Sequence, residues 1–301
     1  MDRRFPLAQL RGASKRYGDR LALDRLDLGL HAGQVTSLLG ANGAGKSTAV
    51  GLLLGLLAAD AGEVSVLGGA PGSDAVRRQC GTMLQQAGIP ERLTAGEMLA
   101  LVRSNYPDPL ALDECVALAG LDGLLDRRYG ALSGGQQRRL QFALAICGRP
   151  RLLFLDEPTT GLDVAARQAL WAAVRSRVAE GCAVLLTTHY LEEAEALSDR
   201  VAVIDRGRLL AEGSVDEIRA RVSLRRIRCV SNVAEAVVAQ WPGVHGATRE
   251  GGTLRIVAEP AEPVLRRLLE ADPQLSDLEI HRAGLAEAFL ALTNASTREA
   301  A

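Results

Sequence analysis

The amino-acid sequence predicts an α/β protein in which a mostly parallel sheet is covered by helices and is followed by a smaller α+β domain. The first supporting observation is size, because 301 residues, 48% of them hydrophobic, suffice for about two domains with a sizeable core. The second is that apolar strands alternate with helical patterns through the first two thirds of the chain. The third is a change in the order of elements beyond residue 221.

The first strand and helix of the predicted sheet flank a glycine-rich turn. The apolar run from Gln34 to Leu39 predicts a buried strand, and an apolar helix pattern runs from Lys46 to Leu57. The alternation returns downstream as a strand over Leu152–Leu155, a helix over Val164–Ala179 and a strand over Ala183–Thr187. Between these two regions, residues 94–126 are mostly helical in pattern, so we expect a helical insertion there.

The last eighty residues read differently. Their pattern is strand (224–230), helix (233–240), two strands around the turn at Gly251, helix (263–271), strand (275–281) and helix (285–292). Without the last helix this order is βαββαβ, the ferredoxin-like arrangement. The boundary falls within an arginine cluster made of Arg219, Arg221, Arg225, Arg226 and Arg228. That cluster could face lipid headgroups or a partner, but a solvated face is the simpler interpretation in so arginine-rich a chain.

Composition excludes several classes of protein. Thirty-five basic and thirty-six acidic residues give a formal net charge of -1, which argues against a surface built for nucleic acid. The longest apolar run, Ala49–Ala59, is too short to span a bilayer, which needs about 20 residues, and no secretory signal is expected. Five cysteines lie 32 to 47 residues apart, a spacing typical of neither a disulfide framework nor a zinc site. We therefore expect structural thiols in a reducing cytoplasm.

A phosphate-binding loop follows the first predicted strand. The segment Gly40-Ala41-Asn42-Gly43-Ala44-Gly45-Lys46-Ser47 fits the full pattern and lies between a strand and a helix. Its glycines let backbone N–H groups point at phosphate oxygens, and the helix that follows adds the positive end of its dipole. A glycine-rich turn without a ligand is the alternative. We expect phosphate binding by Gly40, Asn42, Gly43, Ala44, Gly45, Lys46, Ser47 and Thr48, with Ser47 also a magnesium ligand.

Two acidic residues end the predicted strand at 152–155. Asp156 would lie at the carboxyl edge of the sheet, where it could hold magnesium through water, and Glu157 beside it could polarise an attacking water. Adjacent carboxylates can equally form a helix cap or a surface turn. The phosphate loop in the same chain favours the catalytic interpretation.

A second anion site is predicted at Ser133-Gly134-Gly135-Gln136. Ser133 is a good N-cap, and the two glycines leave the backbone N–H groups at the start of a helix uncovered. One chain with two phosphate-binding surfaces must either bind two nucleotides or share one nucleotide between chains.

The order of these motifs resembles that in the ATP-binding subunit of ABC transporters, over roughly residues 8–220. The resemblance rests on Gly40–Ser47, Leu132–Gln136, Leu152–Glu157, Gly161–Asp163 and His189. It implies a P-loop NTPase domain of the ABC type over 7–220, with an antiparallel N-terminal β subdomain and a helical insertion at about 94–147, and an accessory domain over 222–301. In that family two subunits enclose two ATP molecules, each bound by the phosphate loop of one and the Ser133–Gln136 segment of the other.

The resemblance also implies roles for single residues. Tyr17 would stack on adenine, Asp163 would communicate across the dimer, and His189 would contact the γ-phosphate and orient water with Glu157. Gln85, or Gln86 beside it, would sense magnesium and the attacking water and link the site to the membrane partner. The implied magnesium ligands are Ser47, Gln85 and Asp156. His31, His245 and His281 are expected to be structural.

The segments His189–Glu195 and Leu285–Leu290 further resemble the drug-exporting class, whose permease is a separate chain. The resemblance therefore implies an ATP hydrolase that uses ATP and Mg²⁺ and pairs with a second ATP-binding subunit. It also implies no nucleic acid, and a cytoplasmic location at the inner face of the cell membrane through the permease. The alternatives are a soluble ABC ATPase acting in assembly or regulation without a permease, and a non-hydrolysing nucleotide switch. Glu157 and His189 weigh against the switch.

Lysine is unusually rare in this chain. Only Lys15 and Lys46 are lysine among the 35 basic residues, a bias typical of GC-rich coding. Lys46 occupies a position where a branched guanidinium would crowd the phosphates. The sequence offers no comparable account of Lys15.

Overall fold

The computed structural model describes residues 5–85, 88–221, 225–282 and 284–299. The chain divides into two compact units, an N-terminal unit over Met1–Glu212 and a C-terminal unit over Gly213–Ala301. This division lies earlier than residue 221, where the sequence suggests it. The reason is helix α8 (Val215–Ala220), which begins with a capping box of Ser214 and Glu217 and contacts α11 (Leu285–Glu299) in the C-terminal unit.

The centre of the N-terminal unit is a six-stranded sheet with the order β5-β6-β7-β3-β8-β9. Its pairs from β5 to β8 are parallel. Every residue of β3 and β7 is buried, which explains why these strands read as unbroken apolar runs in the sequence. The strands are β3 (Val35–Leu39), β5 (Cys80–Met83), β6 (Leu152–Asp156), β7 (Ala183–Thr187), β8 (Arg200–Asp205) and β9 (Arg208–Gly213).

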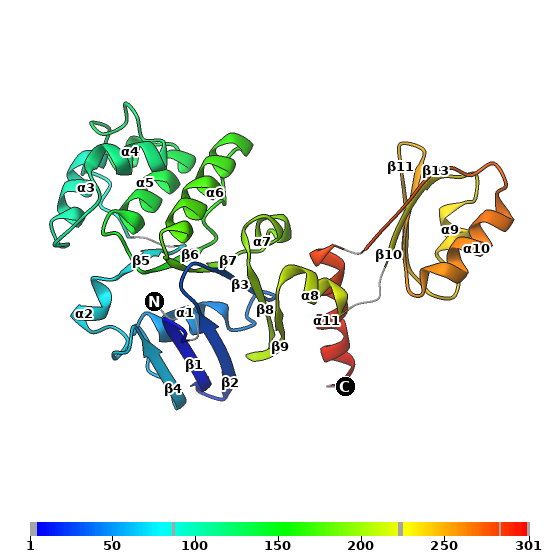
Figure 1. Ribbon diagram of the computed structural model, residues 1–301, viewed down its shortest axis with the longest axis horizontal. Helices are drawn as coiled ribbons and strands as arrows, with labels where there is room; N and C mark the ends of the chain where they lie inside the picture. Colours follow the sequence, from blue (N-terminus) through cyan, green and yellow to red (C-terminus); the bar gives the residue numbers. More distant parts are fainter. Residues whose placement is uncertain (1–4, 86–87, 222–224, 283, 300–301) are drawn as a thin grey trace. The chain divides into compact units, whose positions relative to one another are not determined.

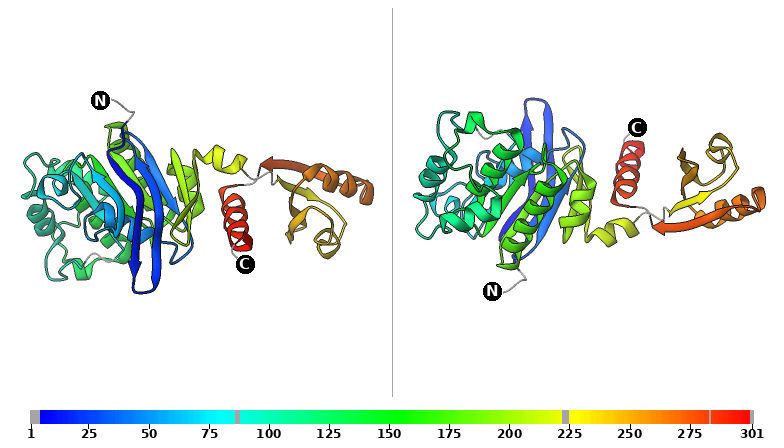
Figure 2. Two further views of the ribbon diagram at one scale, coloured as in Figure 1. Left: turned by 90° about the horizontal axis from the view of Figure 1, so that it is seen from below. Right: turned by 90° about the horizontal axis from the view of Figure 1, so that it is seen from above.

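A second, antiparallel sheet and the helices complete the layers of this unit (Figures 1 and 2). The sheet has the order β2-β1-β4, and α1 (Lys46–Leu53) contacts all three of its strands. Its strands are β1 (Ala8–Tyr17), β2 (Arg20–Leu30) and β4 (Ala61–Val66). On the other side of the parallel sheet lie α3 (Ala95–Arg103), α4 (Leu112–Ala119), α5 (Gly134–Ile146) and α6 (Val164–Ala179). Shorter elements are α2 (Asp74–Arg77), a 3-10 turn at Tyr129–Ala131 and α7 (Leu191–Leu197).

One helix ends earlier than its pattern predicts. Helix α1 ends at Leu53, although its apolar pattern continues to Leu57. The chain turns at Gly55, which has a φ of 69° and lies so close to another loop that a Cβ there would be 2.5 Å from the backbone of Gly72. This contact between distant segments stops the helix. The predictions for α6 and β7 match the observed bounds.

The C-terminal unit contains a four-stranded antiparallel sheet with the order β11-β12-β10-β13. Together with its helices it has the predicted βαββαβ order, and α9 and α10 contact the sheet. Its elements are β10 (Arg225–Val230), α9 (Glu235–Val238), β11 (Val244–Glu250), β12 (Thr253–Ala258), α10 (Ala261–Ala271) and β13 (Ser276–Arg282). Ile227, Leu254 and Leu268 are fully buried in its core. The fold class predicted from the sequence is confirmed for both units.

Two members of the arginine cluster, Arg226 and Arg228, are partly exposed and ion-paired. Arg228 lies 3.2 Å from Glu279, and Arg226 pairs with Glu287. Both arginine side chains are about half exposed. This agrees with the simpler interpretation of the cluster.

The described residues contain no helix long and apolar enough to cross a membrane. The five cysteines are all free. Burial raises the pKa of the Cys80 thiol to about 11 and the pKa values of Cys147 and Cys182 to about 12. Such thiols stay protonated near neutral pH, which fits a structural role.

Candidate active site

The phosphate loop connects β3 to α1 at the carboxyl edge of the parallel sheet. Gly43 and Gly45 have φ angles of 80° and 112°, in the region that favours glycine. A Cβ on Gly45 would lie 2.7 Å from the carbonyl oxygen of Ala22, so β2 packs directly against the loop. The curled loop is thus fixed by both its own glycines and the neighbouring sheet.

Lys46 is the first residue of α1 and folds back over the loop. Its Nζ donates hydrogen bonds to the carbonyl oxygens of Gly40 at 2.7 Å and Ala41 at 3.1 Å. Burial lowers the pKa of Lys46, while the carboxylates of Glu157 and Asp156 act in the opposite direction. The ammonium group is therefore held where it can meet phosphate oxygens.

The two acidic residues at the end of β6 have different surroundings. Asp156 accepts a hydrogen bond from Thr187 Oγ1 on the neighbouring strand β7. Glu157 has a φ of 50°, which is uncommon for a residue with a side chain, and its N–H donates to Thr187 O at 2.9 Å. Strained backbone at a non-glycine residue persists where its surroundings fix it, and such positions cluster at functional sites.

His189 reaches Glu157 from the next strand end. Its Nδ1 lies 3.1 Å from Glu157 Oε1, and its side chain is 47% exposed whereas that of Glu157 is 18% exposed. The histidine can therefore fix the carboxylate on one side and still present its ring to a ligand.

These groups line one pocket of about 590 Å³. Gln85 follows β5 and lies in it, whereas Gln86 lies outside the described residues. The lining residues are Asn42, Gly43, Gly45, Lys46, Ser47, Gln85, Asp156, Glu157 and His189. The structure thus brings together most of the residues predicted for nucleotide and magnesium.

Four residues predicted for the nucleotide line neither this pocket nor the second one described below. Ala44 is 3% exposed and its N–H donates to Ala41 O within the loop, so its side chain belongs to the core. Gly40 and Thr48 belong to the loop and to α1 but are not among the lining residues. Tyr17 ends β1 and is 48% exposed, with Lys15 Nζ lying 5.9 Å from its ring centroid.

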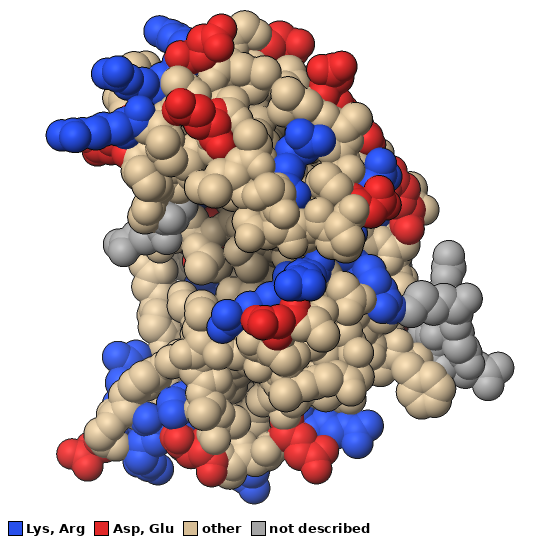
Figure 3. Space-filling model, turned by 90° about the vertical axis from the view of Figure 1, so that its left-hand side faces the viewer, with Lys and Arg blue, Asp and Glu red and all other residues tan. Residues whose placement is uncertain are grey.

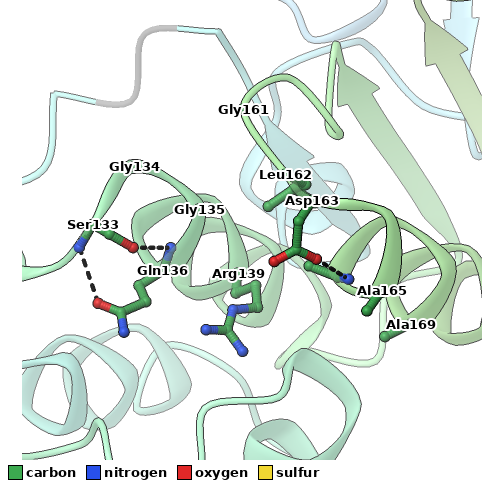
Figure 4. A pocket seen from close by; sticks show the side chains of 11 residues that line it. Ser133, Gly134, Gly135, Gln136, Arg139, Gly161, Leu162, Asp163, Ala165 and Ala169 are labelled. Atoms are coloured by element: carbon green, nitrogen blue, oxygen red, sulfur yellow. Dashed lines mark hydrogen bonds between the residues drawn. The ribbon is translucent and has the colours of Figure 1, made fainter.

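A second pocket of about 680 Å³ contains the rest of the predicted site (Figure 4). Ser133 and Gln136 form a capping box at the start of α5, with hydrogen bonds of 3.3 and 2.9 Å. Asp163 caps α6 by accepting from Ala166 N at 2.8 Å. The lining is Ser133, Gly134, Gly135, Gln136, Arg139, Gly161, Leu162, Asp163, Ala165, Ala166 and Ala169. It shares no residue with the first pocket.

The reason for glycine at the start of α5 is not packing. A Cβ on Gly134 would meet nothing within 4 Å, and one on Gly135 would make only ordinary contacts at 3.5 Å. Neither residue has a positive φ. Glycine here leaves the helix N-terminus open to an approaching group.

Two arginines at the site lie outside the predicted motifs. Arg139 lines the second pocket and donates to Gly120 O at 2.6 Å, and its position one turn beyond Gln136 was a usable signal. Arg20 follows the β1–β2 turn and donates to Gly43 O at 3.2 Å in the phosphate loop. No local pattern indicates that contact.

Comparisons with known proteins agree with this geometry. A family model described as ABC transporter matches residues 23–160. The chain is 40% identical to the daunorubicin resistance ATP-binding protein DrrA3 of Streptomyces coeruleorubidus, covering 95% of this chain and 96% of that protein. It is 37% identical to the Nod factor export ATP-binding protein I of a Rhizobium species, covering 91% and 96%. A solved ATP-binding subunit of an ABC transporter is similar with a TM-score of 0.66 and 29% identity, covering 71% of this chain and 92% of that one.

The fold, the phosphate loop and these relatives define the class of protein. The chain belongs to the family of ATP-binding subunits of ABC transporters. Its relatives in that family include proteins named for daunorubicin or doxorubicin resistance and for Nod factor export, and the chain is a nucleotide-binding ATP hydrolase.

Proposed function

We propose that two copies of this chain close around two ATP molecules and thereby drive a separate membrane permease. Each ATP would be bound by the phosphate loop of one copy and by the Ser133–Gln136 segment of the other. The observation that carries the proposal is the pair of pockets with no residue in common. One has a lysine and carboxylates, and the other has an uncovered helix N-terminus. Each pocket offers part of the groups that bind the phosphates of a nucleoside triphosphate.

Within one ATP site, different side chains of the chain would bind the phosphates, activate water and orient the catalytic carboxylate. Lys46 would hold the β- and γ-phosphates, Glu157 would polarise the attacking water, and His189 would orient that carboxylate and contact the γ-phosphate. Tyr17, exposed at the end of β1, would stack on adenine.

The donors in the first pocket fit magnesium. Ser47, Gln85 and Asp156 all line it and offer oxygen ligands, and Mg²⁺ is commonly held by one or two carboxylates together with substrate phosphates. When bound, the ion would neutralise charge on the phosphate oxygens. In the described residues no group of three or more acidic, histidine or cysteine side chains could hold a metal ion.

A third pocket suggests where the permease would dock. It has a volume of about 310 Å³ and lies where β5, α3 and α5 meet, next to the segment that leads to Gln85. Its lining includes the apolar side chains of Met83, Ile89, Met98, Val102 and Leu144. Figure 3 shows this side of the molecule, where mostly uncharged atoms line a hollow and charges of both signs lie around it. An apolar hollow of this kind suits a short helix of a partner protein.

The cargo and location follow from the relatives by analogy. The relatives include proteins named for resistance to daunorubicin or doxorubicin and for export of Nod factor. We propose export of a drug-like or lipid-like compound, with the subunit held at the cytoplasmic face of the membrane by its permease. An ABC ATPase without a permease is not favoured, because the matching family is described as ABC transporter and one relative is named for export.

Mixed dimers test the shared site. Lys46→Ala disables the phosphate loop and Gly135→Asp fills the open helix start with a negative side chain, so each homodimer should lose ATPase activity. Differently tagged variants purified together should recover roughly half of the wild-type rate, because one of the two composite sites is intact. No recovery in verified mixed dimers would contradict sharing. Normal melting of Gly135→Asp alone would show that its loss is not one of folding.

Co-purification tests whether the chain associates with a permease through the apolar pocket. A hydrophobic multispanning chain should co-purify with this protein in detergent extracts of its host membranes, and Met98→Asp in the apolar pocket should abolish that association. The ATPase rate of Met98→Asp without the permease serves as the control for intact folding. Association that survives the substitution would exclude this pocket as the docking site.

A further inference from the structure

Tyr190 connects His189 to helix α6. The two neighbouring rings have centroids 4.0 Å apart at an angle of 40°. The guanidinium of Arg167, from the second turn of α6, lies 5.6 Å from the Tyr190 ring centroid, within the range of a cation–π contact. The tyrosine ring therefore touches the proposed γ-phosphate ligand and a charged group from a different helix.

A second connection lies one helical turn further along both elements. Trp171, four residues after Arg167, donates from Nε1 to Glu193 Oε1 at 3.2 Å. Glu193 is 1% exposed, and its N–H donates to Tyr190 O at 3.0 Å. The pairs Arg167 with Tyr190 and Trp171 with Glu193 thus join α6 to the start of α7 at two successive levels.

The composition of this cluster is costly if its only role is packing. Glu193 Oε2 and Arg167 Nε are both buried without a hydrogen-bond partner. A buried polar group without a partner destabilises the folded state, and apolar residues of similar size would join two helices at a lower cost in free energy. Tyr190 is also the N-cap of α7 and makes no side-chain cap bond there, although Ser, Thr, Asp or Asn would. A role in the site next to His189 therefore explains these residue types better than local stability does.

Helix α6 also reaches the second pocket. Its N-cap is Asp163, whose carbonyl oxygen accepts from Arg167 N at 2.9 Å. Asp163 lines the pocket that would receive the other copy's nucleotide. The same helix therefore contacts the region behind His189 and carries the residue at the proposed dimer face.

We propose that Tyr190 is a positioning residue for His189, held by Arg167 and by the Trp171–Glu193 hydrogen bond. This inference rests on the proposed role of His189 in hydrolysis. The ring limits the rotation of the imidazole, so that Nδ1 stays on Glu157 and the opposite edge of the ring is presented to the γ-phosphate. Loosening the cluster should then slow the chemical step and leave nucleotide binding nearly unchanged.

Two variants of Tyr190 test this directly. Tyr190→Ala should lower kcat by about tenfold or more while KM for ATP changes less than about twofold, since the imidazole loses its support. Tyr190→Phe keeps the ring and should retain most of the wild-type kcat. Melting temperature and equilibrium ATP binding of both variants establish that the fold and the phosphate loop are intact. Equal rates for Tyr190→Ala and wild type would overturn the proposal, as would an equal loss in Tyr190→Phe.

The second level is tested by a double-mutant cycle. Trp171→Phe removes the indole donor, and Glu193→Met removes the acceptor oxygens at similar side-chain volume. Each should lower kcat severalfold with little change in KM, and the double variant should lose less than the product of the two effects. Strictly multiplicative effects would separate Trp171 and Glu193 from the positioning of His189.

One further variant separates failure of this inference from failure of the proposed function. His189→Ala should abolish most turnover. If it does and Tyr190→Ala is neutral, the positioning role alone is wrong. If His189→Ala hydrolyses ATP at the wild-type rate, the proposed role of His189 fails, and the positioning role fails with it.

Discussion

Nδ1 of His189 lies 3.1 Å from Oε1 of Glu157, although the two residues are far apart in sequence. Glu157 directly follows β6 and His189 follows β7, and these strands are parallel neighbours. The carboxyl ends of parallel neighbours meet at one edge of the sheet, which is where ligands bind in open α/β folds. The pair gives the carboxylate a fixed orientation in a pocket that also holds Lys46 and Ser47.

Glu157→Gln should bind ATP normally and lose most turnover. An amide keeps the size of the side chain but cannot take a proton from water, so the rate should fall by about a hundredfold or more. Equilibrium binding of ATP and release of phosphate in a single turnover measure the two effects separately. Release of phosphate at the wild-type rate would remove Glu157 from its proposed role.

The two lysines should respond differently to arginine. Lys46→Arg should lose nucleotide binding, because Lys46 Nζ sits within hydrogen-bond distance of two loop carbonyls and a guanidinium cannot occupy that space. Lys15 pairs with Asp60 at 2.8 Å, and the Asp60 side chain is 48% exposed. Arginine can keep that pair, so Lys15→Arg should change the free energy of unfolding by less than about 1 kcal/mol. ATP titration and thermal melting of both variants measure this, and equal losses would contradict the distinction.

The local patterns predict the elements well where neighbouring residues determine them. The helix at 164–179 and the strand at 183–187 agree with the structure because their apolar spacing reports burial directly. The apolar pattern overestimates the length of helix α1, because the end of this helix depends on the approach of the distant loop at Gly72. The N-terminal antiparallel sheet was expected only through the family resemblance.

In the candidate site, too, residues in local motifs could be predicted, whereas contacts between distant segments could not. The motifs that contain Lys46, Asp156 and Ser133 predict the chemical roles of these residues. The structure places the three residues in the two pockets. The pairing of Lys15 with Asp60 could not be predicted from the sequence, because the two residues are 45 positions apart and share no motif. The contact of Arg20 with the phosphate loop likewise depends on how β2 packs.

Gly81→Ala should destabilise the N-terminal unit and disturb the pocket at Gln85. A Cβ on Gly81 in β5 would lie 1.9 Å from the backbone oxygen of Ala145 in α5, so strand and helix would have to move apart. Such overpacking costs about 1–3 kcal/mol and occasionally more. Gly246→Ala is the matched control, because that strand glycine in β11 has nothing within 4 Å of its Cβ. Chemical denaturation of both should show a loss in the first variant only, and equal stabilities would contradict the packing argument.

The stability of the C-terminal unit should depend on Asp272 in a pH-dependent way. Asp272 is 5% exposed, and its carboxylate accepts hydrogen bonds from Asn232 N at 2.6 Å, Ser231 Oγ at 2.8 Å and Gln274 N at 3.1 Å. These bonds hold the pKa of Asp272 below its ordinary value of 3.8. The ionised form is therefore the stabilising one, and its contribution is complete above about pH 3.8 and is lost as the pH falls through the lower folded-state pKa.

Asp272→Asn should accordingly lower the stability of the C-terminal unit at neutral pH and leave ATP hydrolysis, which belongs to the N-terminal unit, unchanged. The difference from wild type should shrink below pH 3.8, where protonated Asp272 resembles the amide. Hydrogen exchange followed by mass spectrometry resolves the two units in the full chain, and amides of β10 and α10 should exchange faster in the variant. A difference that stays constant down to pH 3 would show that the hydrogen bonds, and not the charge that they stabilise, carry the effect.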